Sequence, residues 1–266
     1  MNKNIKILVV LIVVLANSIF GQNKLSNELN DLLKDPYFLN CQAAITVYDL
    51  NSRNTVYNYN EKLLLMPASN MKILTSIAAL RFLGANAVFE TKVLYNGEIQ
   101  NDGTLKGDLI IKGGGDPEFS VSDLDKIIII LRNNKINKID GNIIADISFK
   151  DSLFWGEGWM WDDDTSPDAP YLSALNINRN LVEVSVAPGA LNEIPKVSIT
   201  PSTSFFTVSN HAVTLSNPVK KLVISRDFIN RTNEILIKGQ ISSTSNRITS
   251  EMNVWNPELY FLTLFT

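Results

Sequence analysis

The hydrophobic pattern of this chain changes near Ala87, and that change constrains its fold more than any other feature. Between Ser69 and Gly84, apolar residues recur at helical spacing. They are Met71, Leu74, Ile77, Ala78 and Phe82. This pattern predicts a buried helix of about four turns, with Gly84 placed to end it.

After Ala87 the chain switches to short segments of the kind that form β-strands. They lie at 88–95, 104–112, 138–147, 181–186, 197–200, 221–225 and 234–241. One clear helical segment, at 121–133, interrupts them. We therefore expect a mostly β region after Ala87.

Two further local signals lie near the ends of the chain. A short helix is predicted at 25–33, followed by a hairpin whose strands lie at 42–50 and 54–59. At the other end, Asn256-Pro257-Glu258 offers an N-cap, a proline in the first helical position and an early acid, so a helix should start there. That helix shows no C-terminal signal before Thr266, and we expect the sequence to break off inside an element.

The first residues have the composition of an export signal. Lys3 and Lys6 precede an apolar run at 7–16, and a polar segment follows Gly21. This predicts a signal peptide at 1–21. A retained membrane anchor is the alternative, but the apolar stretch is shorter than the ~18 residues that a spanning helix needs.

The overall composition excludes several classes of function. The 266 residues are 45% hydrophobic and 19% charged, which is typical of a globular protein. A net charge of -3 leaves no basic excess for binding nucleic acid. Cys41 is the only cysteine and His211 the only histidine, so an internal disulfide and the usual zinc ligand sets are excluded. We expect Cys41 to be a small buried apolar residue and His211 to lie outside any catalytic triad.

The most specific chemical pattern is Ser69-Asn70-Met71-Lys72, at the start of the predicted helix. Residues three apart on a helix face the same side, so the Lys72 amine can reach the Ser69 hydroxyl. The helix dipole favours an alkoxide at this end, and the Ser69 backbone N–H can help to bind an oxyanion. Buried among apolar neighbours, Lys72 would become neutral and act as general base. The alternative is a capping serine beside a solvated lysine, because this pattern occurs by chance about once in such a chain.

Six collinear segments resemble the class C low-molecular-mass penicillin-binding proteins. They lie at 66–75, 112–117, 140–146, 158–163, 173–180 and 256–259. Members of that family are serine D-alanyl-D-alanine carboxypeptidases and endopeptidases of the bacterial periplasm or cell surface. The resemblance implies that Ser69 is the nucleophile, that Lys72 is its base and that the protein is exported.

The resemblance also implies a fold and a domain order. The fold would be an α/β (α+β) peptidase domain of the penicillin-binding-protein and β-lactamase type, incomplete and interrupted by a large, mostly β insertion. Residues 22–86 would begin the peptidase domain, 87–250 would be the insertion, and 251–266 would start a truncated return to the peptidase domain.

The segment at 158–163 carries one further residue role. In the resembling family an aspartate of this motif projects into the cleft and holds the free amine of the diaminopimelate side chain. By position that residue is Asp163, and a solvated turn is the alternative. Three tryptophans and three acids gather here, which could also indicate a substrate edge or a metal site, although no histidine accompanies them. They are Trp155, Trp159, Trp161, Asp162, Asp163 and Asp164.

Two other family segments are expected to be structural. The glycine-rich segment at 112–117 lacks the ending of a phosphate-binding loop and is predicted to be a turn that ends a strand. The polar segment at 173–180 is predicted to lead into a strand.

The family completes its active site with a Ser-x-Asn box and a Lys-Thr/Ser-Gly strand, both after the return to the peptidase domain. We expect both boxes to be missing from this sequence. We therefore expect a Ser69 acyl-enzyme peptidase for peptidoglycan stem peptides that end in D-Ala-D-Ala, inactive as these 266 residues alone. It would need no cofactor, and β-lactams would inhibit the complete enzyme covalently. The alternatives are a Ser-Lys β-lactamase or esterase and a non-enzymatic fragment that binds the cell wall; nothing in the sequence indicates an oligomeric state.

Overall fold

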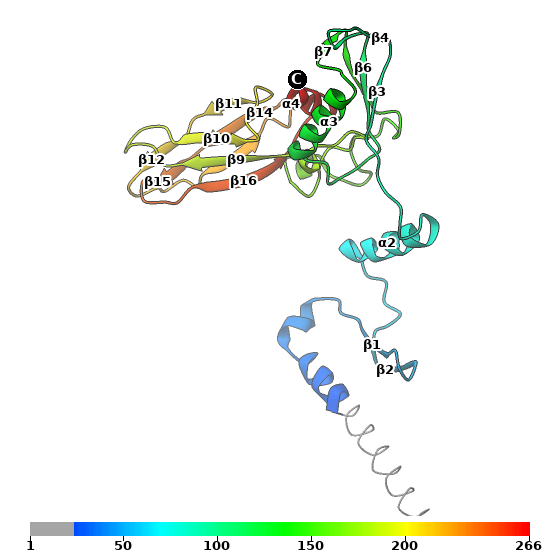
Figure 1. Ribbon diagram of the computed structural model, residues 1–266. Helices are drawn as coiled ribbons and strands as arrows, with labels where there is room; N and C mark the ends of the chain where they lie inside the picture. The colour runs from blue at the N-terminus through cyan, green and yellow to red at the C-terminus, as the bar shows by residue number, and fades with distance from the viewer. Residues whose placement is uncertain (1–23) are drawn as a thin grey trace, which may run out of the picture. The chain divides into compact units, whose positions relative to one another are not determined.

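A computed structural model describes residues 24–266 (Figure 1). The chain divides into two compact units, the first ending at Asn86 and the second running from Ala87 to Thr266. The predicted signal peptide at 1–21 lies outside the described residues. Within the described part, no helix is long and apolar enough to cross a membrane.

The first unit contains the predicted short helix and hairpin. Residues 24–32 are helical. They are followed by η1 (Pro36–Asn40), β1 (Ile45–Asp49), β2 (Asn54–Tyr59), η2 (Ala68–Asn70) and α2 (Met71–Phe82). Strands β1 and β2 pair antiparallel, which confirms the predicted hairpin. The Asp49 carboxylate accepts hydrogen bonds from the Asn51 N–H and the Ser52 hydroxyl and so stabilises the turn.

Helix α2 forms where the sequence predicts it, but it is not buried. None of its 12 residues is buried, and Phe82 is 82% exposed. Gly84 follows the helix with a φ of 83°, the left-handed conformation expected after a helix end. The prediction of burial was wrong because periodicity shows only which residues are apolar. It does not show whether a partner surface for them is present.

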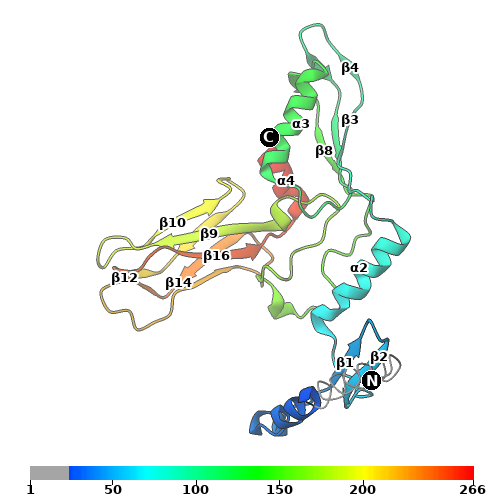
Figure 2. The ribbon, with the colours of Figure 1, turned by 60° about the horizontal axis from the view of Figure 1, so that its bottom comes forward.

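The second unit begins with strands flanked by one helix (Figure 2). The strands are β3 (Lys92–Tyr95), β4 (Glu98–Ile99), β5 (Thr104–Lys106), β6 (Leu109–Lys112), β7 (Lys138–Asp140) and β8 (Ile143–Asp146). They form two sheets, in the orders β3-β6-β8 and β4-β5-β7. Helix α3 (Val121–Asn133) connects β6 to β7, so β5 pairs with β7 and β6 with β8 in parallel. This confirms the predicted helix, and α3 buries Leu124, Ile127 and Leu131 along one face.

The predicted strands at 104–112 and 138–147 are each divided in two. Gly107 breaks the first with a φ of 151°, and Gly141 packs directly on it: a Cβ at Gly141 would lie 2.1 Å from the Gly107 carbonyl oxygen. The Asp108 carboxylate locks this break, because its Oδ1 accepts hydrogen bonds from the Asn142 N–H at 2.8 Å and the Asn142 side chain at 3.0 Å. The glycines therefore mark a change of sheet.

The rest of the second unit is mostly β, as expected. Its strands are β9 (Leu181–Ala187), β10 (Lys196–Thr200), β11 (Thr207–Asn210), β12 (Val213–Leu215), β13 (Val223–Arg226), β14 (Glu234–Lys238), β15 (Gln240–Ser242) and β16 (Ile248–Asn253). They form sheets in the orders β10-β9-β16, β11-β14-β13 and β12-β15. Strands β9 and β14 contribute Val184, Ile235 and Ile237 to one hydrophobic core. The stretch around His211 was expected to be strand-like and contains β11 and β12, whereas β16 was not predicted.

Helix α4 (Pro257–Phe265) closes this core. The Asn256 side chain accepts a hydrogen bond from the Leu259 N–H, which confirms the predicted N-cap. Phe261 is fully buried, and its ring lies 5.3 Å from that of Phe119. Helices α3 and α4 lie side by side in both views (Figure 1, Figure 2). The last residues thus pack within the second unit, and their assignment to a returning peptidase domain stays a prediction.

We predict that Phe261→Ala destabilises the second unit by about 3–5 kcal/mol, because it leaves a cavity in a fully packed core. Leu259→Ala, on the same helix but 48% exposed, should cost about 1 kcal/mol or less. Urea unfolding followed by tryptophan fluorescence measures both, since all 4 tryptophans lie after Ala87. Equal losses for the two variants would contradict the packing described for α4.

Candidate functional site

The Ser69 hydroxyl and the Lys72 amine are in direct contact. Lys72 Nζ lies 3.1 Å from Ser69 Oγ, within hydrogen-bonding distance. Ser69 occupies the 3₁₀ turn η2, which runs straight into α2, and Lys72 is the second residue of that helix. Ala68, just before the serine, has a φ of 44°, an unusual conformation for a residue with a side chain. The backbone therefore turns sharply into the helix at the serine.

This pair has the parts of an activated nucleophile. A charged Lys72 donates to Ser69 Oγ, whereas a neutral amine can instead accept the hydroxyl proton. Both side chains are exposed, so the expected apolar surroundings of Lys72 are not present in these residues. Among the described residues, no carboxylate forms an ion pair with Lys72 that would stabilise its charged form.

One triplet with Ser-x-Asn spacing does occur, at Ser52-Arg53-Asn54 in the β1–β2 turn. The Ser52 hydroxyl donates to Asp49, and the Asn54 side chain donates to the Ser52 carbonyl. Both hydrogen bonds are local to the turn. The triplet therefore has a structural role here.

The three consecutive acids in the second unit have three different environments. Asp162 is exposed. Asp163 is half-buried, and its Oδ2 accepts a hydrogen bond from the Met160 N–H at 2.8 Å, which caps the short helix η3 (Trp161–Asp163). Asp164 points into a buried cluster with Arg226. The structure describes no group of three metal-ligating side chains in residues 24–266, so the acids do not form a cation site there.

The Asp164 cluster ties distant segments of the second unit together. Asp164 forms an ion pair with Arg226 and accepts a hydrogen bond from the Tyr171 hydroxyl at 2.6 Å. Arg226, at the end of β13, is fully buried and also donates to Asn253 in β16 and to the Thr232 carbonyl. Among residues 24–266, Arg226 is the only lysine or arginine that is buried.

The charges in this cluster shift the pKa values of its members. Burial acts to raise the pKa of Asp164, but hydrogen bonds from Tyr171 and the Thr165 N–H and the charge of Arg226 outweigh burial and lower that pKa. Burial, together with the hydrogen bond to Asp164, raises the pKa of Tyr171 to about 12. The carboxylate is therefore ionised and the phenol neutral across physiological pH.

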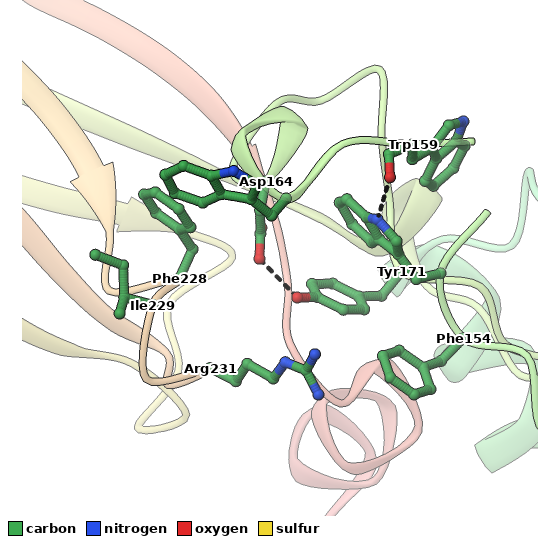
Figure 3. A pocket seen from close by; sticks show the side chains of 9 residues that line it. Phe154, Trp159, Asp164, Tyr171, Phe228, Ile229 and Arg231 are labelled. Atoms are coloured by element: carbon green, nitrogen blue, oxygen red, sulfur yellow. Dashed lines mark hydrogen bonds between the residues drawn. The ribbon is translucent and has the colours of Figure 1, made fainter. Parts of the chain in front are cut away.

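An aromatic pocket lies next to this cluster, with a volume of about 470 Å³ (Figure 3). We call it the aromatic pocket and define it by its nine lining residues: Phe154, Trp155, Trp159, Trp161, Asp164, Tyr171, Phe228, Ile229 and Arg231. The three tryptophans were singled out in the sequence as a possible substrate edge. Phe228, Ile229 and Arg231 come from the β13–β14 turn and were missed, because no local pattern relates that turn to the tryptophans.

The other polar motifs are structural. Asn180 is buried and donates to the Tyr171 carbonyl and to the Asn176 side chain, so the segment at 173–180 does lead into β9 as predicted. The glycine-rich segment follows the end of β6, and a Cβ at Gly113 would lie 2.2 Å from the Ala174 carbonyl oxygen. Among the described residues, the His211 ring forms a hydrogen bond only with the Ser209 hydroxyl. Cys41 is exposed, which corrects the expectation that it is buried.

Comparison with known proteins places these features in a family. Residues 25–266 match the D-Ala-D-Ala carboxypeptidase 3 (S13) family. A D-alanyl-D-alanine carboxypeptidase of Actinomadura sp. (strain R39) is 28% identical over 241 residues, which cover 88% of this chain and 44% of the relative. The D-alanyl-D-alanine carboxypeptidase DacB of Haemophilus influenzae is 33% identical over 155 residues, which cover 57% of this chain and 32% of the relative.

Solved structures agree with this assignment. The crystal structure of penicillin-binding protein 4 of Haemophilus influenzae superposes with a TM-score of 0.73 at 27% identity, covering 84% of this chain and 49% of that one. A crystal structure of the same named protein complexed with a β-lactam superposes with a TM-score of 0.63 at 23% identity and shows the fold alone. This chain spans about half the length of these relatives or less. The mixed α/β fold and the family resemblance expected from the sequence are thereby confirmed, and the chain belongs to the D-Ala-D-Ala carboxypeptidase 3 (S13) family.

Proposed function

We propose that this chain carries the nucleophile of a serine D-alanyl-D-alanine carboxypeptidase that acts on peptidoglycan stem peptides. The observation that carries the proposal is the 3.1 Å contact between Lys72 Nζ and Ser69 Oγ at the start of a helix. Family membership gives the reaction class. The names of the relatives favour a carboxypeptidase over the β-lactamase and esterase alternatives.

The proposed reaction proceeds through an acyl-enzyme. Neutral Lys72 takes the Ser69 hydroxyl proton as Oγ attacks the carbonyl carbon of the penultimate D-alanine. The peptide C–N bond breaks, and the proton passes to the departing amine, so that free D-alanine leaves. Water then attacks the ester and releases the shortened peptide and Ser69. The Ser69 backbone N–H is one candidate donor to the oxyanion.

The same proposal gives the place of action. Peptidoglycan lies outside the cytoplasm, and the basic and apolar residues at 1–21 have the order of an export signal. We therefore propose export to the bacterial periplasm or cell surface. No cofactor is needed for this chemistry, because serine and lysine supply both nucleophile and base.

The remaining catalytic groups are proposed to lie outside these 266 residues. Two observations support this. Apolar side chains of α2 beside the nucleophile are largely exposed, Ile73 and Ile77 among them, although such a surface normally packs against protein. The relatives are also about twice as long as the part that this chain matches. We call a polypeptide in which these 266 residues continue into the part of the family that they do not cover the extended form.

We predict that Ser69→Ala abolishes release of D-alanine from a peptide ending in D-Ala-D-Ala by the extended form, because no group replaces the nucleophile. Lys72→Ala should lower the rate about 10²- to 10⁴-fold, since it removes the general base. Ser76→Ala, on the same helix, is the control and should leave the rate unchanged. Full activity of Ser69→Ala in this assay would refute the proposed nucleophile.

We predict that the 266-residue polypeptide alone forms no covalent adduct with fluorescent penicillin, whereas the extended form does. A second oxyanion donor and a proton shuttle near Ser69 are each worth about 10²-fold or more in rate. Gel fluorescence after denaturation measures the adduct. Efficient Ser69-dependent labelling of the 266-residue form would show that its own residues complete the site.

Asp163 is proposed to bind the free amine of the diaminopimelate side chain. Its Oδ2 is engaged by the Met160 N–H, and its Oδ1 forms no hydrogen bond to the described residues, which leaves an oxygen for an ammonium group. The role is carried over from the family motif by position. The half-buried setting of the side chain is consistent with it.

We predict that Asp163→Asn in the extended form raises KM for diaminopimelate peptides about 10-fold or more, while reaction with a simple penicillin is unchanged. The asparagine amide oxygen can still accept the hydrogen bond from the Met160 N–H, so the substitution removes only the negative charge. Asp162→Asn, at the exposed neighbour, is the matched control. Equal losses on the peptide and on penicillin would argue that Asp163 has only a structural role.

A further inference from the structure

The aromatic pocket has an exposed stacking surface at its mouth. Trp161 stacks on Phe228 with ring centroids 5.8 Å apart, yet Trp161 is 72% exposed. Deeper in the pocket, Trp155 and Trp159 contact each other edge to face at 5.1 Å. A large aromatic side chain held by its neighbours and left open to water is typical of a binding surface.

The pocket also carries a cation with free donors. The Arg231 guanidinium lies 5.5 Å from the centre of the Phe154 ring and 5.6 Å from that of Trp255. Figure 3 shows the Arg231 side chain extending toward Phe154 and Tyr171. Arg231 is absent from the ion pairs that the described residues form, and its guanidinium makes no hydrogen bond to them. Its N–H groups are therefore available to an anion.

The charges that line the pocket are one carboxylate and one guanidinium, and only the guanidinium is left without a charged partner. Asp164 is the one carboxylate in the lining, and it is already paired with buried Arg226 and with the Tyr171 hydroxyl. Arg231 is the remaining charge. A ligand that suits the pocket thus combines a ring that can stack on tryptophan with a carboxylate that the guanidinium fork can hold.

We propose that the aromatic pocket, whose lining residues all belong to the second unit, is a binding site for an N-acetylated amino sugar that bears a carboxylate. Amino-sugar rings present an apolar C–H face to tryptophan, and about 470 Å³ is within the range of small-ligand sites. The choice of a glycan rests on the proposed function, because the sugar adjoining a stem peptide carries the carboxylate to which that peptide is joined. Sugar residues without a stem peptide would present that group free.

The 4 tryptophans of the chain make the test specific. Three of them line the pocket and Trp255 contacts Arg231, so intrinsic fluorescence reports mainly on this site. The 266-residue chain is titrated with N-acetylmuramic acid, with N-acetylglucosamine, which lacks the carboxylate, and with acetyl-D-Ala-D-Ala, which lacks the sugar. We expect saturable changes in emission, with the acidic sugar binding about 10-fold or more tighter than either other probe.

Two variants separate charge from stacking. Arg231→Gln should weaken the acidic sugar about 10-fold or more and leave N-acetylglucosamine unchanged. Arg247→Gln removes an exposed arginine elsewhere in the same unit and should change neither. Trp161→Ala should weaken both sugars.

Several results would overturn the assignment: no saturable change, equal affinity for the acidic and neutral sugars, no effect of Arg231→Gln, or a dipeptide that binds as tightly as the acidic sugar. Ser69→Ala should bind the acidic sugar normally. Sugar binding without D-alanine release by the extended form would refute only the proposed peptidase. Release of D-alanine by the extended form without sugar binding to the pocket would refute only this pocket assignment.

Discussion

The buried guanidinium of Arg226 is the interaction on which the organisation of the second unit depends. It is fully inaccessible to solvent, and it joins Asp164 in the tryptophan-rich loop to Asn253 in β16 and to the carbonyl of Thr232. Removing one member of such a buried pair leaves the other charge unpaired, at a typical cost of about 3–5 kcal/mol. The pair also contacts the ring of Tyr171, whose hydroxyl donates to Asp164. One charge thus fixes a loop, a turn and a strand against each other.

This constraint has a functional consequence for the residues beside it. Asp164 is held inside the unit, and its half-buried neighbour Asp163 has one carboxylate oxygen free of described partners. The Asp164–Arg226 ion pair also holds the loop that carries Trp161 near the turn that carries Phe228 and Arg231. A binding site built in this way needs little rearrangement on binding, and rigid supports of this kind keep recognition groups in place. If Asp163 and the aromatic pocket have the proposed roles, the second unit contributes binding groups to the peptidase.

The features that the sequence predicts correctly are local. The Ser69–Lys72 contact follows from a three-residue spacing on a helix, and the start of α4 follows from Asn256 and the proline after it. The features that it misses depend on distant partners: β16 forms by pairing with β9, and Arg226 meets an acid 62 residues away. Whether α2 is covered is likewise a property of other segments. The cluster of tryptophans in the sequence indicated the aromatic pocket. The cation of that pocket, Arg231, lies in the β13–β14 turn, which shows no recognisable sequence pattern.

The central claim is that Ser69 becomes covalently acylated. The most direct measurement is to incubate the extended form with benzylpenicillin, digest it and locate the added mass by tandem mass spectrometry. The account predicts one added penicilloyl group per chain, on the peptide that contains Ser69, and a loss of the adduct when Lys72 is replaced by alanine. An adduct on a different serine, or an extended protein that remains unmodified while folded, would contradict it.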